Sequence, residues 1–470
     1  MTSSVGASGE SLRVALIGSG PSGFYAAEHL LKSPLNIAVD MFERLPTPYG
    51  LVRGGVAPDH PKIKTVTRVY EKIAAKPGFR FFGNVELGRD VSVADLTAHY
   101  HAIVYAVGAQ SDRRMGVPGE DLPGSHAATE FVGWYNAHPD YRDLSFDLSQ
   151  TAVAVIGNGN VAMDVARILA STREELAVTD IADYALEALS RSSVTDIYLL
   201  GRRGPAQAAF TNPELKEMGE LHDADVIVLP GDAALDSLSD EYLRAAGDRS
   251  AEKNVQMLQE YAGRAPQGKP KRIHMRFLVS PIRLIGTERV EAIEVVHNAL
   301  AKSEDGSLRP RATERTEIIP VGLVFRSIGY MGVPLADVPF DARKGVIPNR
   351  LGRVIEGDSE RVGEYVVGWM KRGPSGIIGT NKPDSQETAD QLLSDFAEGK
   401  MLRPTAGDIL PLLKARGVEV VTFDDWLLLD AVEQARGQDE GRPRRKFARV
   451  EDMLDAIQGA RESAAQPSGD

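Results

Sequence analysis

One local pattern occurs twice in this sequence, and it restricts the possible folds more than any other feature. An apolar run, a glycine turn and a segment with helical apolar spacing follow one another at LRVALIGSGPSGFYAAEHLLKS, residues 12–33, and again at TAVAVIGNGNVAMDVARILAS, residues 151–171. A second strand-like run follows each, IAVDMFER at 37–44 and, after a longer gap, VTDIYLLGRR at 194–203. Such alternation predicts an α/β fold with mainly parallel sheets. The two turns lie about 140 residues apart, so we expect two nucleotide-binding domains.

Two further strand-like runs predict how these domains are connected. AIVYAVGAQSD at 102–112 and GLVFRSIGY at 322–330 suit the two crossings of an inserted domain. We therefore expect one domain from residues 1–108 and 326–470, with a flexible start at 1–10 and a helical C-terminal segment, and a second domain from 109–325. The predicted fold class is α/β, with two Rossmann-like dinucleotide-binding domains, three-layer ββα/αβα sheets, and the second domain inserted into a discontinuous first.

The chain contains no cysteine, which removes several kinds of chemistry. Disulfides, iron–sulfur clusters held by the chain itself, thiolate zinc sites and redox-active CxxC pairs are excluded. Electron transfer would need a bound organic cofactor or a separate protein. His99 and His101 alternate without a third ligand nearby, so we interpret both as surface residues and predict no metal site.

Charge and hydropathy limit the partners and the location. The formal net charge of −12 argues against nucleic-acid binding. No run of 18 or more apolar residues occurs, so we expect no membrane-spanning helix and a cytoplasmic location. The basic run RPRRK at 442–446 is interpreted as a solvated stretch, and a monomer is our default expectation.

The first glycine turn has the spacing of a dinucleotide site. Gly18, Gly20 and Gly23 form GxGxxG, which allows a tight turn, approach of a pyrophosphate, and close helix–strand packing. Glu43 follows Gly18 by 25 residues, near the position of a ribose-binding acid. The alternative is a purely structural turn. A small-residue turn at 106–109 and GWMKRGPSGIIGTN at 368–381 favour FAD, since an extended cofactor needs support from distant segments.

The second turn is followed by arginines instead of an acid. Gly157, Gly159 and Ala162 form the permitted variant GxGxxA. Arg202 and Arg203 follow the next strand, where an NAD site would have a carboxylate; paired guanidinium groups favour the 2′-phosphate of NADPH. Arg202 lies 45 residues after Gly157, and a helical stretch at 172–191 accounts for the extra length. The alternative is a solvated basic turn.

With these motifs in place, the sequence resembles the adrenodoxin reductase-type ferredoxin–NADP reductases, particularly the actinobacterial NADPH–ferredoxin reductases. The resemblance runs from about residue 12 to about residue 390 and implies an FAD domain in two pieces with an NADPH domain inserted between them. It is carried by GSGPSGFYAA, LPTPYGLVRGGVAPDHPKIK, FRFFGNVELG, YAVGAQSDR, FVGWYNAHP, VIGNGNVAMDVARIL, GRRGPAQAAFT and GWMKRGPSGIIGTN.

The resemblance implies a set of site residues. Besides the first glycine turn and Glu43, the positions matching FAD contacts are Ser22, Leu51, Leu87, Trp369, Gly376, Ile377 and Ile378. The positions matching NADP contacts are Arg113, Asn158, Gly159, Asn160, Val161, Arg202, Arg203, Glu214 and Gly376, the last lying where nicotinamide meets flavin. His60 and Glu217 match a catalytic pair beside the nicotinamide, which would orient its amide and tune local charge; a turn residue is the alternative for His60.

The expected activity is an FAD-dependent NADPH–ferredoxin oxidoreductase: a hydride passes from NADPH to FAD, and single electrons then pass to a separate ferredoxin. Disulfide reductases and the glutamate-synthase small subunit need cysteines that this chain lacks. Flavin monooxygenases carry an FxGxxxHxxxW-like fingerprint that FFGNVELGRD does not continue. An NADPH-binding flavoprotein that senses redox state or docks a partner without fast turnover is the alternative.

Overall fold

The computed structural model describes residues 11–465, so the predicted flexible start at 1–10 lies outside the described residues. The chain divides into two compact units. The first consists of the described residues up to Val56, of His60–Ser111, and of the described residues from Tyr330 onward; the second consists of Ala57–Asp59 and Asp112–Gly329. The assignment of FAD to one domain and NADPH to the other stays a prediction.

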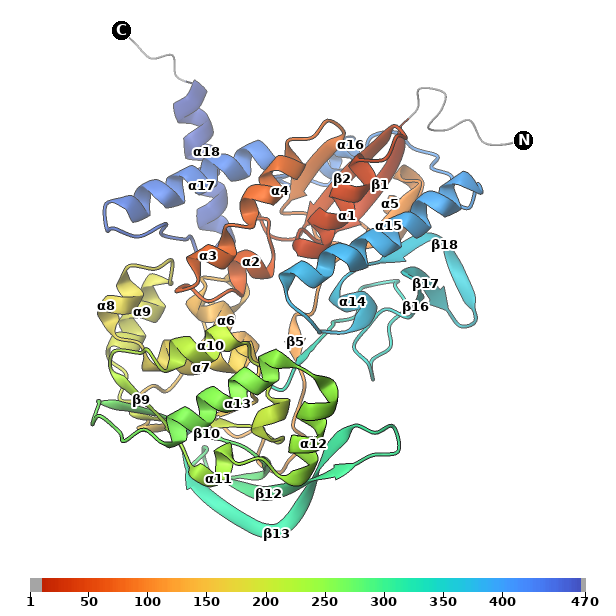
Figure 1. Cartoon of the computed structure of the whole chain (residues 1–470). Coiled ribbons are helices and arrows are strands. Elements are labelled where there is room, and N and C mark those ends of the chain that lie inside the picture. Colours follow the sequence, from red (N-terminus) through yellow and green to blue (C-terminus); the bar gives the residue numbers. More distant parts are fainter. Residues whose placement is uncertain (1–10, 466–470) are drawn as a thin grey trace. The chain divides into compact units, whose positions relative to one another are not determined.

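The first unit contains a seven-stranded sheet in which five neighbouring strands are parallel (Figure 1). The strand order is β16-β17-β18-β4-β1-β2-β3, with β16 and β17 antiparallel at one edge. The bounds are β1 Leu12–Ile17, β2 Ile37–Glu43, β3 Phe79–Gly83, β4 Ala102–Tyr105, β16 Asn349–Arg350, β17 Arg353–Glu356 and β18 Ser359–Val366. The chain leaves β1 toward β2 on one side and returns to β4 on the other. The carboxyl end of β1 is therefore a switch point, where α/β sheets bind ligands.

Both faces of this sheet are buried, which makes the unit three layers thick. Along β1, Leu12, Val14 and Leu16 belong to one hydrophobic cluster, whereas Ala15 and Ile17 belong to another. The alternation follows from the two-residue period of a strand. The first cluster also holds residues of α1 (Pro21–Leu31), α15 (Asn381–Ala397), α17 (Phe423–Gln438) and α18 (Val450–Ala465). The second holds residues of α5 (Val93–His99) and α16 (Leu410–Ala415).

Short elements complete the first unit. Figure 1 shows α1 and α15 side by side, and the Ser385 hydroxyl on α15 donates to the Ser22 carbonyl oxygen on α1. The remaining elements are α2 Leu51–Gly54, α3 Pro61–Lys64, α4 Thr67–Ala74, β15 Tyr330–Met331, α14 Trp369–Arg372 and the 3₁₀ helix η3 Ile378–Thr380. The two-residue strand β5, Ser111–Asp112, lies where the chain passes from the first unit to the second.

The second unit has a six-stranded parallel sheet covered on one face by a smaller antiparallel sheet. The parallel order is β6-β14-β7-β8-β10-β9, and the three-stranded sheet runs β11-β12-β13. Ala154 and Val324 of the first sheet share a core with Ile293 and Ile319 of the second. The strand bounds are β6 Ser125–Ala127, β7 Ala152–Ile156, β8 Asp196–Leu200, β9 Ala224–Val228, β10 Lys271–Arg276, β11 Val279–Ile285, β12 Ala292–Lys302, β13 Leu308–Pro320 and β14 Leu323–Arg326.

The helices of the second unit include the predicted excursion before β8. Two helices, α8 and α9, lie between α7 and β8. They confirm the predicted helical stretch that accounts for the 45-residue spacing between Gly157 and Arg202. The bounds are α6 Ala128–Tyr135, η1 Pro139–Tyr141, α7 Asn160–Ala170, α8 Arg173–Ala177, α9 Asp183–Ser190, η2 Pro205–Gln207, α10 Asn212–Met218, α11 Pro230–Ala233, α12 Ser237–Ala246 and α13 Arg249–Ala262. The two layered α/β units confirm the predicted fold class. No helix within residues 11–465 is long and apolar enough to span a bilayer.

Two local predictions are wrong. His101 is buried, not at the surface, and its Nδ1 accepts the backbone N–H of Arg13 at 3.1 Å. The run at 442–446 is not simply solvated, because Arg442 and Lys446 are both buried. His101 and the run at 442–446 both form hydrogen bonds with residues that are distant in the sequence. Local charge patterns do not reveal such contacts.

Candidate functional site

The first glycine turn forms an open backbone cradle between β1 and α1. Gly18 has a φ of +104°, and a Cβ there would lie 2.5 Å from the Ala106 carbonyl oxygen. A Cβ on Gly23 would lie 2.4 Å from the Gly18 carbonyl oxygen, so only glycine allows the helix this close to the strand. At Gly20, which precedes α1, no described atom lies within 4 Å of a Cβ position. The turn therefore has room for a pyrophosphate beside the helix N-terminus.

Glu43 closes β2 beside this turn. Its Oε2 accepts the backbone N–H of Ser19 at 3.2 Å and the Ser19 hydroxyl at 2.6 Å, while Oε1 accepts the backbone N–H of Leu45. These bonds fix the carboxylate at the carboxyl end of the sheet. Oε1 keeps one acceptor site, which suits one hydroxyl of a ribose; the ribose contact stays a prediction.

The other FAD positions predicted in the N-terminal part lie around the same edge. Leu51 opens α2 and is 37% exposed, and Leu87 is half-buried against the second hydrophobic cluster. Ser22 is buried, and a Cβ on Gly368 would lie 2.6 Å from its Oγ. Gly368 precedes α14, so the structure brings together, within the first unit, two distant segments that are predicted to contact FAD.

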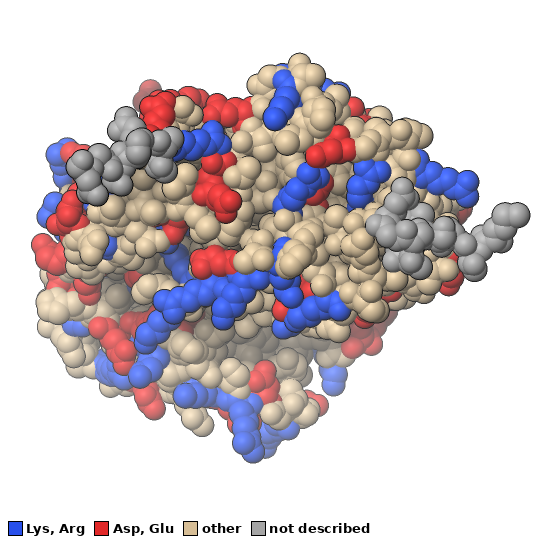
Figure 2. Space-filling view, turned by 90° about the horizontal axis from the view of Figure 1, so that it is seen from above, with Lys and Arg blue, Asp and Glu red and all other residues tan. Residues whose placement is uncertain are grey.

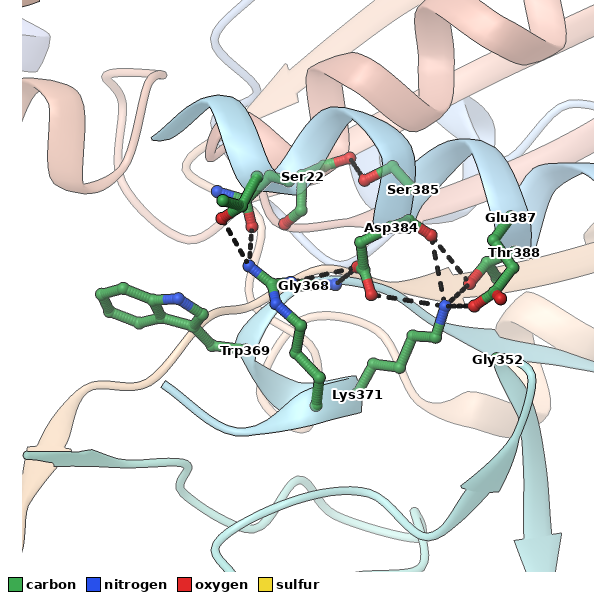
Figure 3. Close-up of polar contacts among 12 residues, drawn as sticks. Ser22, Gly352, Gly368, Trp369, Lys371, Asp384, Ser385, Glu387 and Thr388 are labelled. Carbon is green, nitrogen blue, oxygen red and sulfur yellow. Dashed lines mark hydrogen bonds and ion pairs between the residues drawn. The ribbon is translucent and has the colours of Figure 1, made fainter. Parts of the chain in front are cut away.

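The loop that begins at Gly368 is held by a carboxylate that no sequence motif predicts (Figure 3). Asp384 Oδ2 accepts the Gly368 backbone N–H at 2.6 Å and lies 3.2 Å from Arg372 Nη1, while Oδ1 lies 3.3 Å from Lys371 Nζ. Lys371 Nζ also donates to Glu387 and Thr388. One carboxylate thus ties the start of the loop to α14 and α15.

The same loop turns sharply at its far end. Trp369 Nε1 and Arg372 Nη2 both donate to the Ser375 carbonyl oxygen at 3.3 Å. Gly376 follows with a φ of +81°, and a Cβ there would lie 2.3 Å from Thr380 Oγ1. Ile377 is 64% exposed, and Ile378 begins η3. The turn therefore presents a side-chain-free backbone edge at Gly376, which would allow flat rings to approach.

The second glycine turn repeats this construction in the other unit. A Cβ on Gly157, whose φ is +140°, would lie 2.2 Å from the Ser327 carbonyl oxygen, and the Cβ position of Gly159 is open among the described residues. Asn160 Oδ1 accepts the Thr211 backbone N–H at 2.9 Å, and Val161 continues the first turn of α7. Asn158 Nδ2 is buried with no hydrogen-bond partner among residues 11–465. A buried donor without a partner fits a site that receives a polar ligand.

Arg202 and Arg203 follow β8 next to this turn. The backbone is fixed because Asn298 Nδ2 donates to the Arg202 carbonyl oxygen and Leu278 N–H donates to that of Arg203. No carboxylate of the described chain forms an ion pair with either guanidinium. Burial and the charge of Arg202 lower the pKa of Arg203. Two cations without an acidic partner fit an incoming phosphate.

Glu214 belongs to a buried ionic cluster centred on Arg167. Arg167 Nη1 donates to Glu214 Oε2 at 2.9 Å, and the guanidinium also binds Asp59 and Asp164. Burial acts to lower the pKa of Arg167, but the three carboxylates outweigh it and raise the pKa well above its usual range. The contact with Arg167 explains why Ala57–Asp59 belongs to the second unit. In the sequence, the signal for Arg167 is no more than its position three residues after Asp164 on a mainly apolar helix.

The remaining predicted residues lie in both units. Arg113 is half-buried, and its backbone N–H donates to the Gly329 carbonyl oxygen at 2.9 Å. Glu217 lies one turn after Glu214 on α10, whereas His60 precedes α3 in the first unit. The pairing of His60 with Glu217 stays a prediction.

Comparison with known proteins gives consistent matches. Residues 12–199 match the family described as pyridine nucleotide-disulphide oxidoreductase. The chain is 48% identical to NADPH-ferredoxin reductase FprA of Mycobacterium tuberculosis over 453 residues, covering 94% of this chain and 98% of that protein. It is 41% identical to the mitochondrial NADPH:adrenodoxin oxidoreductase of Salvelinus fontinalis, covering 94% and 90%. The solved structure of M. tuberculosis FprA in complex with NADPH superposes with a TM-score of 0.90 at 47% identity, covering 96% of this chain and all of that one.

Proposed function

Since this chain belongs to the NADPH–ferredoxin reductase family, we propose that it is an FAD-dependent NADPH–ferredoxin oxidoreductase. The observation that carries the proposal is the pair of glycine turns on separate parallel sheets, one followed by an acid and the other by two arginines. A disulfide reductase with its own redox cysteines, which the family description also suggests, is excluded because the chain contains no cysteine.

We assign FAD to the first unit. The backbone cradle at Gly18–Gly23 would hold the pyrophosphate, and Glu43 would accept a hydroxyl of the adenosine ribose. The loop from Gly368 would lie along the flavin, with Gly376 giving close approach because it has no side chain. The other proposed FAD contacts are Ser22, Leu51, Leu87, Trp369, Ile377 and Ile378.

We assign NADPH to the second unit. The N-terminus of α7 and the amide of Asn158 would bind the pyrophosphate, while Arg202 and Arg203 would bind the 2′-phosphate that distinguishes NADPH from NADH. The other proposed contacts are Arg113, Gly159, Asn160, Val161, Glu214 and, from the first unit, Gly376.

When bound, FAD supplies the acceptor for the NADPH hydride and the donor of single electrons to an iron–sulfur protein. The protein's residues supply binding and orientation. His60 and Glu217 would hold the nicotinamide amide and adjust the charge around it, and no general base is needed for hydride transfer itself. A flavin exposed to solvent would pass electrons to acceptors other than the ferredoxin. By covering the flavin, the loop at 368–376 would limit these side reactions.

The electron acceptor is a separate ferredoxin, since this chain cannot ligate a cluster through cysteine. Despite the net charge of −12, residues 61–76 carry five basic side chains and one acidic one, and Lys62, Arg68 and Lys72 are exposed. Figure 2 shows Lys and Arg side chains grouped on a face that also carries many acidic ones. An acidic ferredoxin would be attracted to such basic groups. A cytoplasmic monomer that does not bind nucleic acid completes the proposal.

Stopped-flow mixing with NADPH tests this function and separates it from a sensor. We expect the purified protein to be yellow, its flavin absorbance to bleach rapidly with NADPH, and cytochrome c reduction to depend on added ferredoxin. Slow bleaching without ferredoxin-dependent turnover would favour the redox sensor. A protein that does not take up FAD would contradict both functions.

A further inference from the structure

The C-terminal part of the chain, beyond the reach of the family motifs, is built into the first unit. The backbone of Val421 pairs with Gly83 at the end of β3 through hydrogen bonds of 2.8 and 3.0 Å. Trp426 and Leu429 on α17 are buried in the same hydrophobic cluster as Leu12 of β1. The segment is therefore part of the core that supports the first glycine turn.

A loop at residues 47–55, which includes the short helix α2, lies directly on that glycine turn. The Tyr49 backbone N–H donates to the Ser19 carbonyl oxygen at 3.1 Å. A Cβ on Gly50 would lie 3.1 Å from the Gly20 Cα, so the two backbones are in close contact. Tyr49 itself has a φ of +87°, a conformation that is unfavourable for a bulky side chain and persists only where surrounding contacts impose it.

Trp426 supplies one of those contacts. Its Nε1–H donates to the Tyr49 hydroxyl oxygen at 3.3 Å, and the two rings meet edge to face with centroids 5.6 Å apart. Both side chains are buried. The Trp426 indole thus fixes the side chain of Tyr49, and the backbone of Tyr49 contacts the glycine turn.

Glu433 supplies the second contact, through Arg53 at the end of the same loop. The Arg53 guanidinium donates to both Glu433 carboxylate oxygens, at 2.8 and 2.6 Å, and lies 5.1 Å from the Trp426 ring centroid. Glu433 is fully buried, and its Oε1 also accepts the Phe447 backbone N–H. Lys446 Nζ donates to the Arg53 carbonyl oxygen at 3.2 Å. A forked, buried pair of this kind fixes the geometry of both partners.

We infer that Trp426 and Glu433 are positioning residues for the FAD site: through Tyr49 and Arg53 they hold the loop at 47–55 against the Ser19–Gly20 turn. The inference rests on the proposed binding of FAD at that turn. It gives α17 and the segment that follows it a role in retaining the cofactor, in addition to packing. Loosening these two contacts should let the loop leave the turn and speed the release of FAD.

The test uses the variant Trp426→Phe/Arg53→Lys, which keeps an aromatic ring and a positive charge but loses the indole N–H and the guanidinium fork. FAD release from the holoenzyme is followed after dilution by the rise in flavin fluorescence, well below the melting temperature of each protein. We expect release about tenfold faster than from the wild type. Tyr49→Phe removes only the hydroxyl acceptor and should speed FAD release about threefold. This variant keeps the inference testable if the double variant does not fold.

Arg461→Gln is the matched control. It cuts a bidentate pair of 2.7 and 2.6 Å between α18 and Asp425 on α17, a pair that does not involve the loop. We expect a lower melting temperature with FAD release at the wild-type rate. Unchanged release from the double variant and from Tyr49→Phe, or equally fast release from Arg461→Gln, would overturn the inference. A wild-type protein without FAD would instead overturn the proposed function, and this inference with it.

Discussion

The carboxylate of Asp384 on α15 and the backbone N–H of Gly368, the residue before α14, are joined by a 2.6 Å hydrogen bond. The same carboxylate lies beside Lys371 and Arg372, so it connects three points of the segment that leads to Gly376. The proposed flavin loop therefore depends on one acidic side chain of α15.

Replacing Asp384 with asparagine should loosen this loop. We expect the free energy of unfolding to fall by about 2 kcal/mol, because Arg372 loses its charged partner and Lys371 keeps only Glu387, in a largely buried place. FAD should also bind more weakly. Urea unfolding and FAD titration measure the two effects. Asp390→Asn is the control, since Asp390 on the same helix is 55% exposed and pairs only with His29 among the described residues; similar losses in both variants would contradict the special position of Asp384.

The two arginines after β8 should select NADPH. We expect Arg202→Ala/Arg203→Ala to lower kcat/KM for NADPH about 100-fold, the loss of two charge-assisted hydrogen bonds, and to change kcat/KM for NADH only slightly. Steady-state kinetics with both nucleotides measure this. Arg191→Ala, an exposed arginine of the same unit paired with Glu187, should leave both values unchanged. Equal losses for NADPH and NADH would disprove the phosphate assignment.

Arg167 should be essential to the stability of the second unit. Arg167→Met leaves Asp59, Asp164 and Glu214 close together without their common cation, so we expect a loss of about 3–5 kcal/mol. The urea midpoint, followed by circular dichroism, tests this. Arg191→Met serves as the exposed control, for which a change below about 1 kcal/mol is expected. A wild-type midpoint for Arg167→Met would show that the cluster does not stabilise the fold.

Asp112 should make stability depend on pH. Burial raises the pKa of Asp112 from 3.8 to about 6, so its charged form is disfavoured in the folded protein. The resulting penalty is absent below about pH 4, grows as the pH rises, and is complete above about pH 6. We expect Asp112→Asn to gain stability relative to wild type over that interval and to hold the gain at higher pH, as measured by melting temperatures from pH 3 to 8.

Asp95 provides the comparison of opposite sign. A hydrogen bond from Arg416 lowers the pKa of Asp95 from 3.8 to about 2. Its charged form is therefore favoured by folding, and Asp95→Asn should lose stability above about pH 4, with a difference that shrinks as the pH falls toward 2. The same pH dependence for both variants would contradict the assigned pKa shifts.

The parts of the fold that depend on backbone geometry could be predicted from the sequence. Gly18 and Gly157 are set by local geometry, because a Cβ at either position would strike a neighbouring carbonyl oxygen. The residues that end the following strands could be located from their spacing after the glycine turns. Asp384, Arg167 and Glu433 could not be predicted, since their partners are remote in sequence and only the tertiary fold brings them together. For the same reason the prediction of a solvated run at 442–446 is wrong: Arg444 pairs with Asp430, and Lys446 donates to the Arg53 carbonyl oxygen.

The antiparallel sheet of the second unit ends in β13, a 13-residue strand at its edge with most of its side chains exposed. A long open edge can pair with strands of other molecules. Along β13, however, Arg309, Arg311, Glu314 and Arg315 place charges at short intervals, and a second copy of the strand would bring like charges together. The composition of this one strand therefore protects the protein from edge-to-edge aggregation.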